Sequence, residues 1–174
     1  MLKIVAIVVV VIAAFLLYAS TRPDSFRVER TVAIKAPPGK VFPHIDTFAN
    51  WAAWSPWEKM DPAMKKTASG PASGKGAVTE WEGNSKVGKG RMEILESVPP
   101  SKVVIKLDFV TPMEAHNTAE FTLSAQGDAT TVTWAMHGPM PFASKVFTIF
   151  ASMDRLVGKD FEAGLANLKT IAEK

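Results

Sequence analysis

The side chains that could carry out chemistry are few and scattered in this chain of 174 residues. Its three histidines, His44, His116 and His137, lie too far apart for any two to share a helix face, and none has a carboxylate at a spacing typical of a zinc site. The chain has no cysteine and no Gly-x-Ser-x-Gly motif, so neither a thiol nor an activated serine is available as a nucleophile. We therefore predict no catalytic residue, no metal site and no cofactor.

General acid–base chemistry would require polar side chains that face a cavity. Alternation along the predicted strands turns only Thr79 and Asn117 inward, with Arg91 or Glu93 near the cavity mouth and His137 at a strand end. Asn117 is the best placed of these to orient a ligand, although a hydrogen-bonded structural amide is the more ordinary interpretation. The polar residues therefore favour binding over catalysis.

The strands that position these residues are predicted from alternating apolar and polar side chains after residue 25. We predict six to seven strands, at residues 26–34, 65–69, 77–81, 88–98, 103–109, 113–123 and 130–137. The last two are joined by a hairpin at Gln126-Gly127-Asp128. On the inward face, small side chains such as Ala77 and Ala119 interleave with large ones, which favours a cavity over a solid core.

Two short helices are predicted after the first strand, at residues 40–46 and 48–57. The second carries three tryptophans in seven positions, Trp51, Trp54 and Trp57. Such a concentration of indole rings indicates either a packed lid, in which each N–H finds a hydrogen-bond partner, or the aromatic rim of a ligand cavity.

Apolar residues recur every three or four positions from residue 141 to the C-terminus, which predicts one amphipathic helix of roughly thirty residues. Its apolar stripe is Phe142, Val146, Phe150, Met153, Val157, Phe161, Leu165 and Leu168. Lys145 and Lys159 fall on the opposite side. Gly158 and Gly164 each cost about 1 kcal/mol relative to alanine, which is tolerable where another backbone passes close by. A stripe of this length needs a large apolar partner, and the inward face of the sheet provides one.

Residues 4–19 form an uninterrupted apolar run near the N-terminus. This run is about 24 Å long as a helix, slightly short of a hydrocarbon core of about 30 Å but able to span it with snorkelling ends. A cleaved signal peptide is the rival interpretation, but Leu17 and Tyr18 stand where a cleavage site needs small residues; a buried helix is a third. We predict a membrane anchor at residues 1–21, a linker at 22–25 and a monomeric soluble domain at 26–174.

The net charge is only +3 and the basic residues are dispersed, which argues against a nucleic-acid partner. Lys3 precedes the apolar run, whereas Arg22, Arg27 and Arg30 follow it, so the positive-inside rule leaves the orientation open. We expect a single-pass protein of the bacterial inner membrane with its soluble domain in the periplasm.

Several short motifs occur in a characteristic order along residues 26–174. They are Trp51…Trp54-Ser55-Pro56-Trp57, Trp81-Glu82-Gly83, Gly88…Gly90-Arg91-Met92, Val132-Thr133-Trp134 and Gly158…Asp160-Phe161-Glu162…Gly164-Leu165. Together they resemble the START-like (SRPBCC) superfamily and, within it, the polyketide cyclase/dehydrase branch. The resemblance implies an α+β helix-grip fold, in which a curved antiparallel sheet wraps around a long C-terminal helix and encloses a hydrophobic tunnel. That superfamily includes lipid carriers, hormone binders and cyclases, so no set of catalytic residues comes with it.

We predict that one chamber between sheet and helix binds the ligand. Its lining is Trp81, Phe109, Asn117, Phe121, Trp134 and Met136 from the strands, Met153, Val157 and Phe161 from the helix, and Trp54 and Trp57 at the mouth. So apolar a lining suits a small apolar molecule or a lipid held mainly by buried area. Two alternatives stay open: a polyketide cyclase or dehydrase, and a protein-interaction module that carries no ligand.

Overall fold

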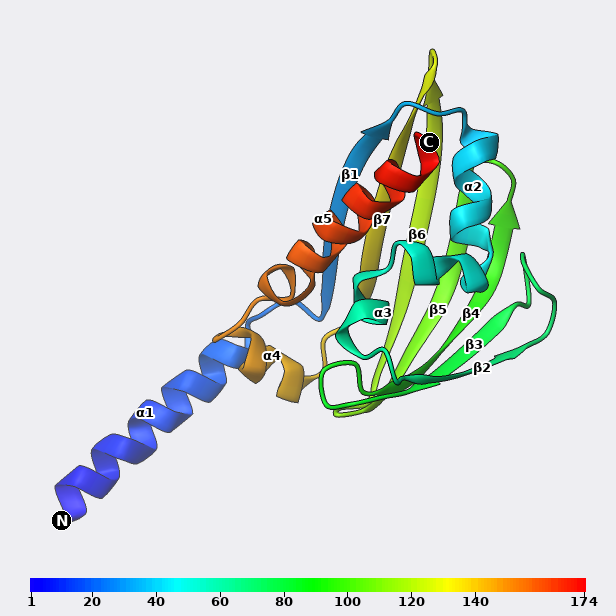
Figure 1. Cartoon of the computed structure of the whole chain (residues 1–174). Helices are drawn as coiled ribbons and strands as arrows, with labels where there is room; N and C mark the ends of the chain where they lie inside the picture. The colour runs from blue at the N-terminus through cyan, green and yellow to red at the C-terminus, as the bar shows by residue number, and fades with distance from the viewer.

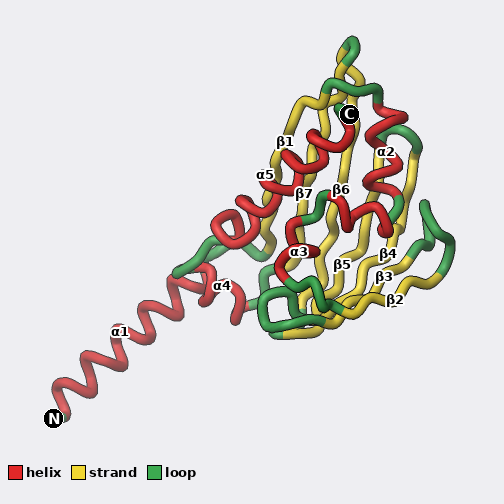
Figure 2. The backbone as a smooth tube through the Cα atoms, viewed as in Figure 1, coloured by secondary structure: helices red, strands yellow, loops and turns green.

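The computed structural model describes residues 1–174 and is built on one antiparallel sheet in the order β1-β7-β6-β5-β4-β3-β2. Figure 1 and Figure 2 show the short helices that follow the first strand and the C-terminal helix lying over the same face of this sheet. The strands are Ser25–Ile34 (β1), Lys65–Ser69 (β2), Val78–Glu82 (β3), Lys89–Val98 (β4), Lys102–Thr111 (β5), Ala115–Gln126 (β6) and Ala129–Pro139 (β7). The predicted α+β helix-grip fold is confirmed.

The pairing of β5 with β6 shows how alternation produces the buried face. Val103 and Ile105 of β5 lie opposite Phe121 and Ala119 of β6, and all four side chains are buried. Thr122, between the buried residues Phe121 and Leu123, is exposed. Because successive side chains point to opposite faces of a strand, this register gives the sheet one apolar face.

Three short helices follow β1: α2 (Pro38–Asp46), the 3₁₀ helix η1 (Phe48–Ala53) and α3 (Pro56–Met60). The single helix predicted at 48–57 is therefore divided. Ser55 adopts an extended backbone (φ −66°, ψ 127°) before Pro56, as a residue that precedes proline prefers. Pro56 then begins α3, where its missing N–H leaves no helical hydrogen bond unmade.

The prediction of one long C-terminal helix is wrong in its bounds. Two helices occupy the stretch, α4 (Phe142–Thr148) and α5 (Met153–Ala172). The backbone between them is extended at Ser152 (φ −62°, ψ 150°), and the Ser152 hydroxyl accepts a hydrogen bond from the N–H of Arg155 at 3.3 Å. Ser152 therefore caps α5, and of these two helices only α5 lies against the sheet.

Gly158 and Gly164 of α5 make room for side chains and not, as predicted, for another backbone. A Cβ on Gly158 would come within 2.4 Å of the Arg30 guanidinium, and one on Gly164 within 2.9 Å of the Trp134 ring. Arg30 reaches from β1 across the back of α5, where its partners are Glu162, at 2.7 Å, and Asp154, at 2.8 Å. This contact explains the one charged residue on the otherwise apolar face of β1.

The N-terminal helix α1 (Leu2–Ser20) projects away from the domain (Figure 1). Its mean hydropathy reaches 2.8, and Ala19 is its one buried residue. Nineteen residues extend about 28 Å as a helix, close to the thickness of a hydrocarbon core. The helix is therefore long and apolar enough to cross a membrane, a property that signal sequences share.

Candidate functional site

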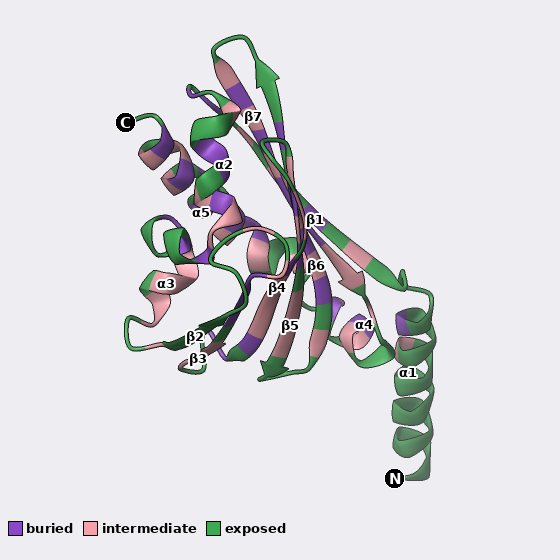
Figure 3. Ribbon diagram, turned by 90° about the vertical axis from the view of Figure 1, so that its right-hand side faces the viewer, coloured by how far each residue is buried: buried purple, intermediate pink, exposed green.

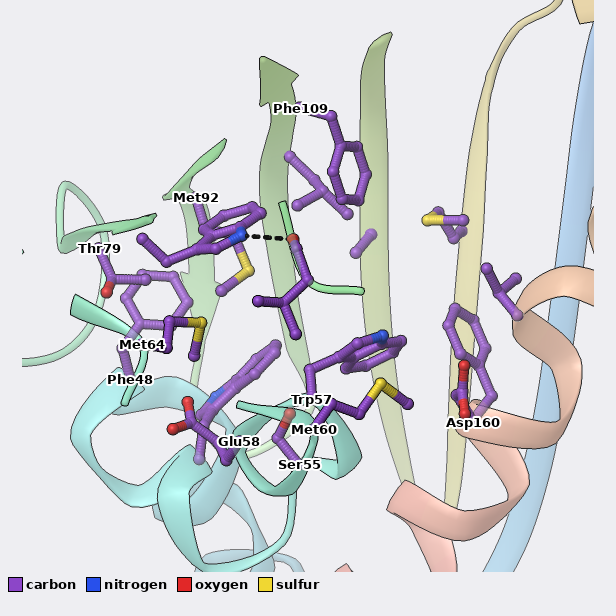
Figure 4. A pocket seen from close by; sticks show the side chains of 18 of the residues that line it. Phe48, Ser55, Trp57, Glu58, Met60, Met64, Thr79, Met92, Phe109 and Asp160 are labelled. Atoms are coloured by element: carbon purple, nitrogen blue, oxygen red, sulfur yellow. Dashed lines mark hydrogen bonds between the residues drawn. The ribbon is translucent and has the colours of Figure 1, made fainter. Parts of the chain in front are cut away.

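A cavity of about 320 Å³ lies between α5, α3 and the inner face of the sheet. Twenty-two residues line it and 16 of them are hydrophobic. Figure 4 shows the side chains that converge on it, with Met92 and Phe109 on the strands, Trp57 and Met60 on α3, and Asp160 on α5. Its volume is at the lower end of the range of about 300–1,000 Å³ found for small-molecule sites.

Most of the residues that the sequence nominated as a lining do come together around this cavity. They are Trp57, Trp81, Phe109, Trp134, Met136, Val157 and Phe161. Alternation along the strands located those from the sheet, and helical periodicity located those from α5.

Four nominated residues lie elsewhere. Trp54 and Phe121 are fully buried in the core, and Met153 packs against that core from the start of α5. Asn117 faces inward as predicted but lies over Gly138, where a Cβ would come too close to the Asn117 side-chain oxygen. Alternation along a strand predicts which face of the sheet a side chain occupies. It does not predict whether that side chain reaches the cavity, because the cavity covers only part of the inner face.

The Trp54 side chain lies in a packed layer beneath the cavity and not at its mouth. The indole N–H groups of Trp51 and Trp54 donate to the carbonyls of Ile45 and His44, both at 2.9 Å. Asn167 of α5 donates in turn to the Trp54 carbonyl at 2.9 Å. These hydrogen bonds connect η1 to α2 and α5. Of the two interpretations of the tryptophans, a packed lid or a cavity rim, Trp54 therefore fits the packed lid.

The cavity has further lining residues that the sequence analysis did not nominate. They are Phe48, Trp51, Ser55, Glu58, Met60, Met64, Lys66, Thr79, Lys86, Val87, Met92, Leu107, Ala119, Leu156 and Asp160. Inward parity could have identified Met92, Leu107 and Ala119. Met64 and Val87 lie in irregular turns, where no periodic pattern marks the buried side.

Trp134 is packed among several aromatic rings in the cavity wall. Its ring stacks on Phe161 with centroids 4.1 Å apart and planes 5° apart, and on Phe121 at 4.9 Å and 26°. Trp54 and Trp57 meet the same ring edge-on. Aromatic contacts of these geometries stabilise beyond the area they bury, so this wall is preformed.

The Trp134 indole N–H is buried without a hydrogen-bond partner. Leaving a buried donor unsatisfied costs about 1–3 kcal/mol, and such groups are rare in native proteins. Trp134 lines the cavity through its ring, whereas its N–H has no exposed area, so an acceptor on a bound molecule would reach this N–H only by displacing a neighbouring side chain.

The cavity wall also includes charged side chains, among them Glu58, Lys66 and Asp160. Glu58 and Lys66 form an ion pair at 2.7 Å, whereas Asp160 on α5 has no ion-pair partner. Desolvation by burial raises the pKa of the Asp160 carboxyl above its ordinary value of 3.8. No group of three or more His, Asp or Glu side chains comes close enough together to hold a metal ion.

Asp160→Asn should stabilise the protein at pH 7. Because the folded-state pKa is raised, the folded protein retains the proton more strongly, and its stability falls as pH rises through the window above 3.8. The gain from the substitution should be full above the folded pKa and absent below about pH 3. Thermal unfolding of both proteins across this range measures it. Asp128→Asn, in the exposed β6–β7 turn, controls for loss of a charge, and a gain independent of pH would contradict the account.

The family model for polyketide cyclase/dehydrase and lipid transport matches residues 25–173. No curated protein matches the sequence. Among solved structures, protein CV1439 from Chromobacterium violaceum has a TM-score of 0.60 at 16% identity, covering 88% of this chain and 99% of that one. A Thermobifida fusca protein has a TM-score of 0.63 at 17% identity, with coverages of 84% and 92%.

The di-domain ARO/CYC protein BexL, from the BE-7585A biosynthetic pathway, has a TM-score of 0.61 at 18% identity. The match covers 91% of this chain and 53% of BexL. At these identities the similarity establishes the fold alone.

Proposed function

Because the chain belongs to the polyketide cyclase/dehydrase and lipid transport family, we propose that it is a membrane-anchored module that binds or transfers an apolar small molecule or lipid. The observation that carries the proposal is the preformed cavity of about 320 Å³, in which 16 of 22 lining residues are hydrophobic. Apolar area would supply most of the affinity, at about 25 cal/mol per Å² less the costs of ordering.

The volume of the cavity limits the size of the ligand. A volume of about 320 Å³ suits one acyl chain or a few fused rings better than a lipid with two chains. The unpartnered N–H of Trp134 favours a ligand with a hydrogen-bond acceptor, such as a carbonyl or carboxylate oxygen, that reaches this group by displacing a covering side chain.

The anchor supports transfer in particular. Helix α1 is apolar from Ile4 to Ala19 and adds only Ala19 to the buried residues. As a membrane-spanning helix, it would hold the cavity beside the bilayer from which an apolar ligand partitions. The domain would not require α1 for its fold, since the core is made by β1 and the elements that follow it.

Titration of a fluorescent fatty acid into the chain lacking residues 1–20 tests the binding proposal, once circular dichroism has verified its fold. Saturable binding with weak dependence on salt is expected, because area and not charge holds the ligand. No binding by the folded domain would contradict the proposal.

Trp134→Phe tests the role of the indole N–H, since phenylalanine keeps an aromatic ring in the stack but removes the donor. One hydrogen bond contributes about 0.5–1.5 kcal/mol, so affinity for the fatty acid should fall roughly 2- to 10-fold. Affinity for a polycyclic hydrocarbon without an acceptor, measured in the same titration, should change much less. Equal losses for both probes would assign the effect to packing and not to the hydrogen bond.

An enzyme acting on such a ligand is the second candidate, and Asp160 is the observation that favours it. A carboxyl whose pKa is raised by desolvation, at the wall of an apolar cavity, has the property required of a general acid. Turnover of an aromatic or polyketide-like substrate that is lost in Asp160→Asn, with binding retained, would support catalysis over transfer.

A further inference from the structure

The exposed apolar side chains outside α1 are unevenly distributed. Leu95 and Val98 lie in β4. The others form a surface that we call the apolar rim, made of Val110, Met113, Phe142, Phe147, Phe150 and Leu156. The rim comes from the end of β5, the β5–β6 turn, α4, the segment after α4 and the first turns of α5. Strand pairing places the β5–β6 turn beside the end of β7, so all of these segments lie at the end of the domain where α1 is attached.

Helix α4 buries polar side chains and exposes aromatic ones, the reverse of what is expected for a helix that faces water. Its buried side chains are Lys145 and Thr148, whereas Phe142 and Phe147 are each about half exposed, at 49% and 48%. The Lys145 ammonium group is satisfied by the carboxylate of Asp24, in the linker between α1 and β1. A short helix that turns its cation inward and its aromatic rings outward is suited to an apolar environment.

The rim meets the apolar surface of α1 at Phe150. The rings of Phe150 and Phe15 pack with centroids 5.8 Å apart, so the segment after α4 contacts α1 within its apolar run. Figure 3 shows α4 beside the domain end of α1, with the end of β5 at the level of the upper turns of α1. A bilayer that contained α1 would therefore reach the rim as well.

We propose that the apolar rim is a second membrane-contacting surface that seats the domain in the interfacial layer of the bilayer containing α1. The inference rests on the proposed anchor. The large patch of exposed aromatic and aliphatic groups is then covered by lipid. The exposed Glu114 carboxylate beside Met113 sets the depth, because a charged group belongs at the headgroups and not in the hydrocarbon.

The rim also adjoins the cavity. Leu156 belongs to both, and Met64 and Val87, in turns at the same end of the sheet, line the cavity. A domain seated by its rim therefore presents this end of the cavity to the bilayer surface. An apolar ligand would pass between lipid and cavity with little exposure to water.

The absence of cysteine allows a fluorophore to be attached at one chosen position. Met113→Cys, Phe147→Cys and, as a matched control, Leu95→Cys are labelled with an environment-sensitive dye in the full chain. Each is then reconstituted into phosphatidylcholine–phosphatidylglycerol vesicles. At positions 113 and 147 we expect blue-shifted emission, quenching by spin-labelled lipid and protection from iodide. At position 95 we expect quenching by iodide alone.

Positions 113 and 147 behaving like position 95 would overturn the proposal. Protection from iodide that depends on protein density, without quenching by lipid, would also overturn it and identify an interface between two copies of the chain. A label at Ile7→Cys distinguishes the anchor proposal from the rim proposal. Quenching by lipid at position 7 but not at the rim would support the membrane anchor and reject membrane contact by the rim. Fatty-acid binding by the chain lacking residues 1–20 is unaffected by either outcome.

The double variant Phe142→Ser/Phe147→Ser tests the consequence for transfer. Neither residue lines the cavity, so equilibrium binding of the fatty acid should be unchanged. Uptake of the same probe from vesicles by the full chain should be slower. An unchanged uptake rate would contradict a role of the rim in ligand entry.

Discussion

Phe161→Ala should lower the free energy of unfolding by about 3–5 kcal/mol, the range for emptying a buried aromatic site. The Phe161 side chain is 2% exposed and stacks on Trp134 at 4.1 Å. Its loss would separate α5 from the sheet at the cavity wall. Chemical denaturation of the chain lacking residues 1–20 measures the change.

Lys159→Ala provides the control on the same helix. Lys159 is exposed and forms no ion pair, so its replacement should change stability by no more than about 0.5 kcal/mol. Small and equal effects at both positions would mean that α5 does not hold the fold together.

Ala119→Trp should abolish fatty-acid binding while the domain stays folded. Ala119 is 4% exposed, lies on β6 and lines the cavity, so an indole at this position would occupy the space left for the ligand. Added bulk inside a protein costs typically about 1–3 kcal/mol, less than the stability of most domains. Probe titration and thermal unfolding, measured on the same sample, separate blocked binding from unfolding.

Thr122→Trp is the matched control, because Thr122 lies on the same strand with its side chain exposed on the outer face. It should leave probe affinity unchanged. If Ala119→Trp unfolds the domain, Met92→Trp offers a second block from β4, at a partly exposed lining position. Undiminished binding in a folded variant that carries either internal tryptophan would place the ligand outside this cavity.

The sheet was predictable because alternation over a long strand has one dominant interpretation. The hairpin at Gly127 was equally clear, and the structure gives this glycine a φ of +63°, a conformation that favours glycine. Strand bounds differ from the predictions by no more than a few residues, as in β6, which extends to Gln126.

The division of the C-terminal stretch was missed because apolar periodicity continues through the break. Phe142 and Phe150 belong to the predicted stripe but are exposed, and Lys145, predicted to face solvent, is buried. Periodicity shows which residues of a helix are apolar, but it does not show whether their side chains pack against the sheet or lie on the surface. Ser152, an N-cap residue within the apolar run, was the available signal.

The candidate site was predictable to the level of a face. Trp134 and Phe161 were located by parity and periodicity, whereas Trp54 and Phe121 share their chemistry but lie in the core. Whether an inward-facing residue lines the cavity or lies in the core depends on which part of the sheet's inner face is covered by α2 and η1, and the sequence pattern does not show this. Asp160 was not predicted to line the cavity. It precedes Phe161, and helical spacing places it at the border between the apolar and polar faces of the helix, where periodicity does not indicate whether a side chain is buried.

Native mass spectrometry of the chain lacking residues 1–20, purified from a bacterial host without detergent, tests the ligand-binding claim most directly. We expect a fraction of the protein to carry one apolar molecule with a single acyl chain or a few rings, and to lose it in Ala119→Trp but not in Thr122→Trp. Protein that is always ligand-free, and that stays so after incubation with fatty acids and lipid extracts, would contradict the claim.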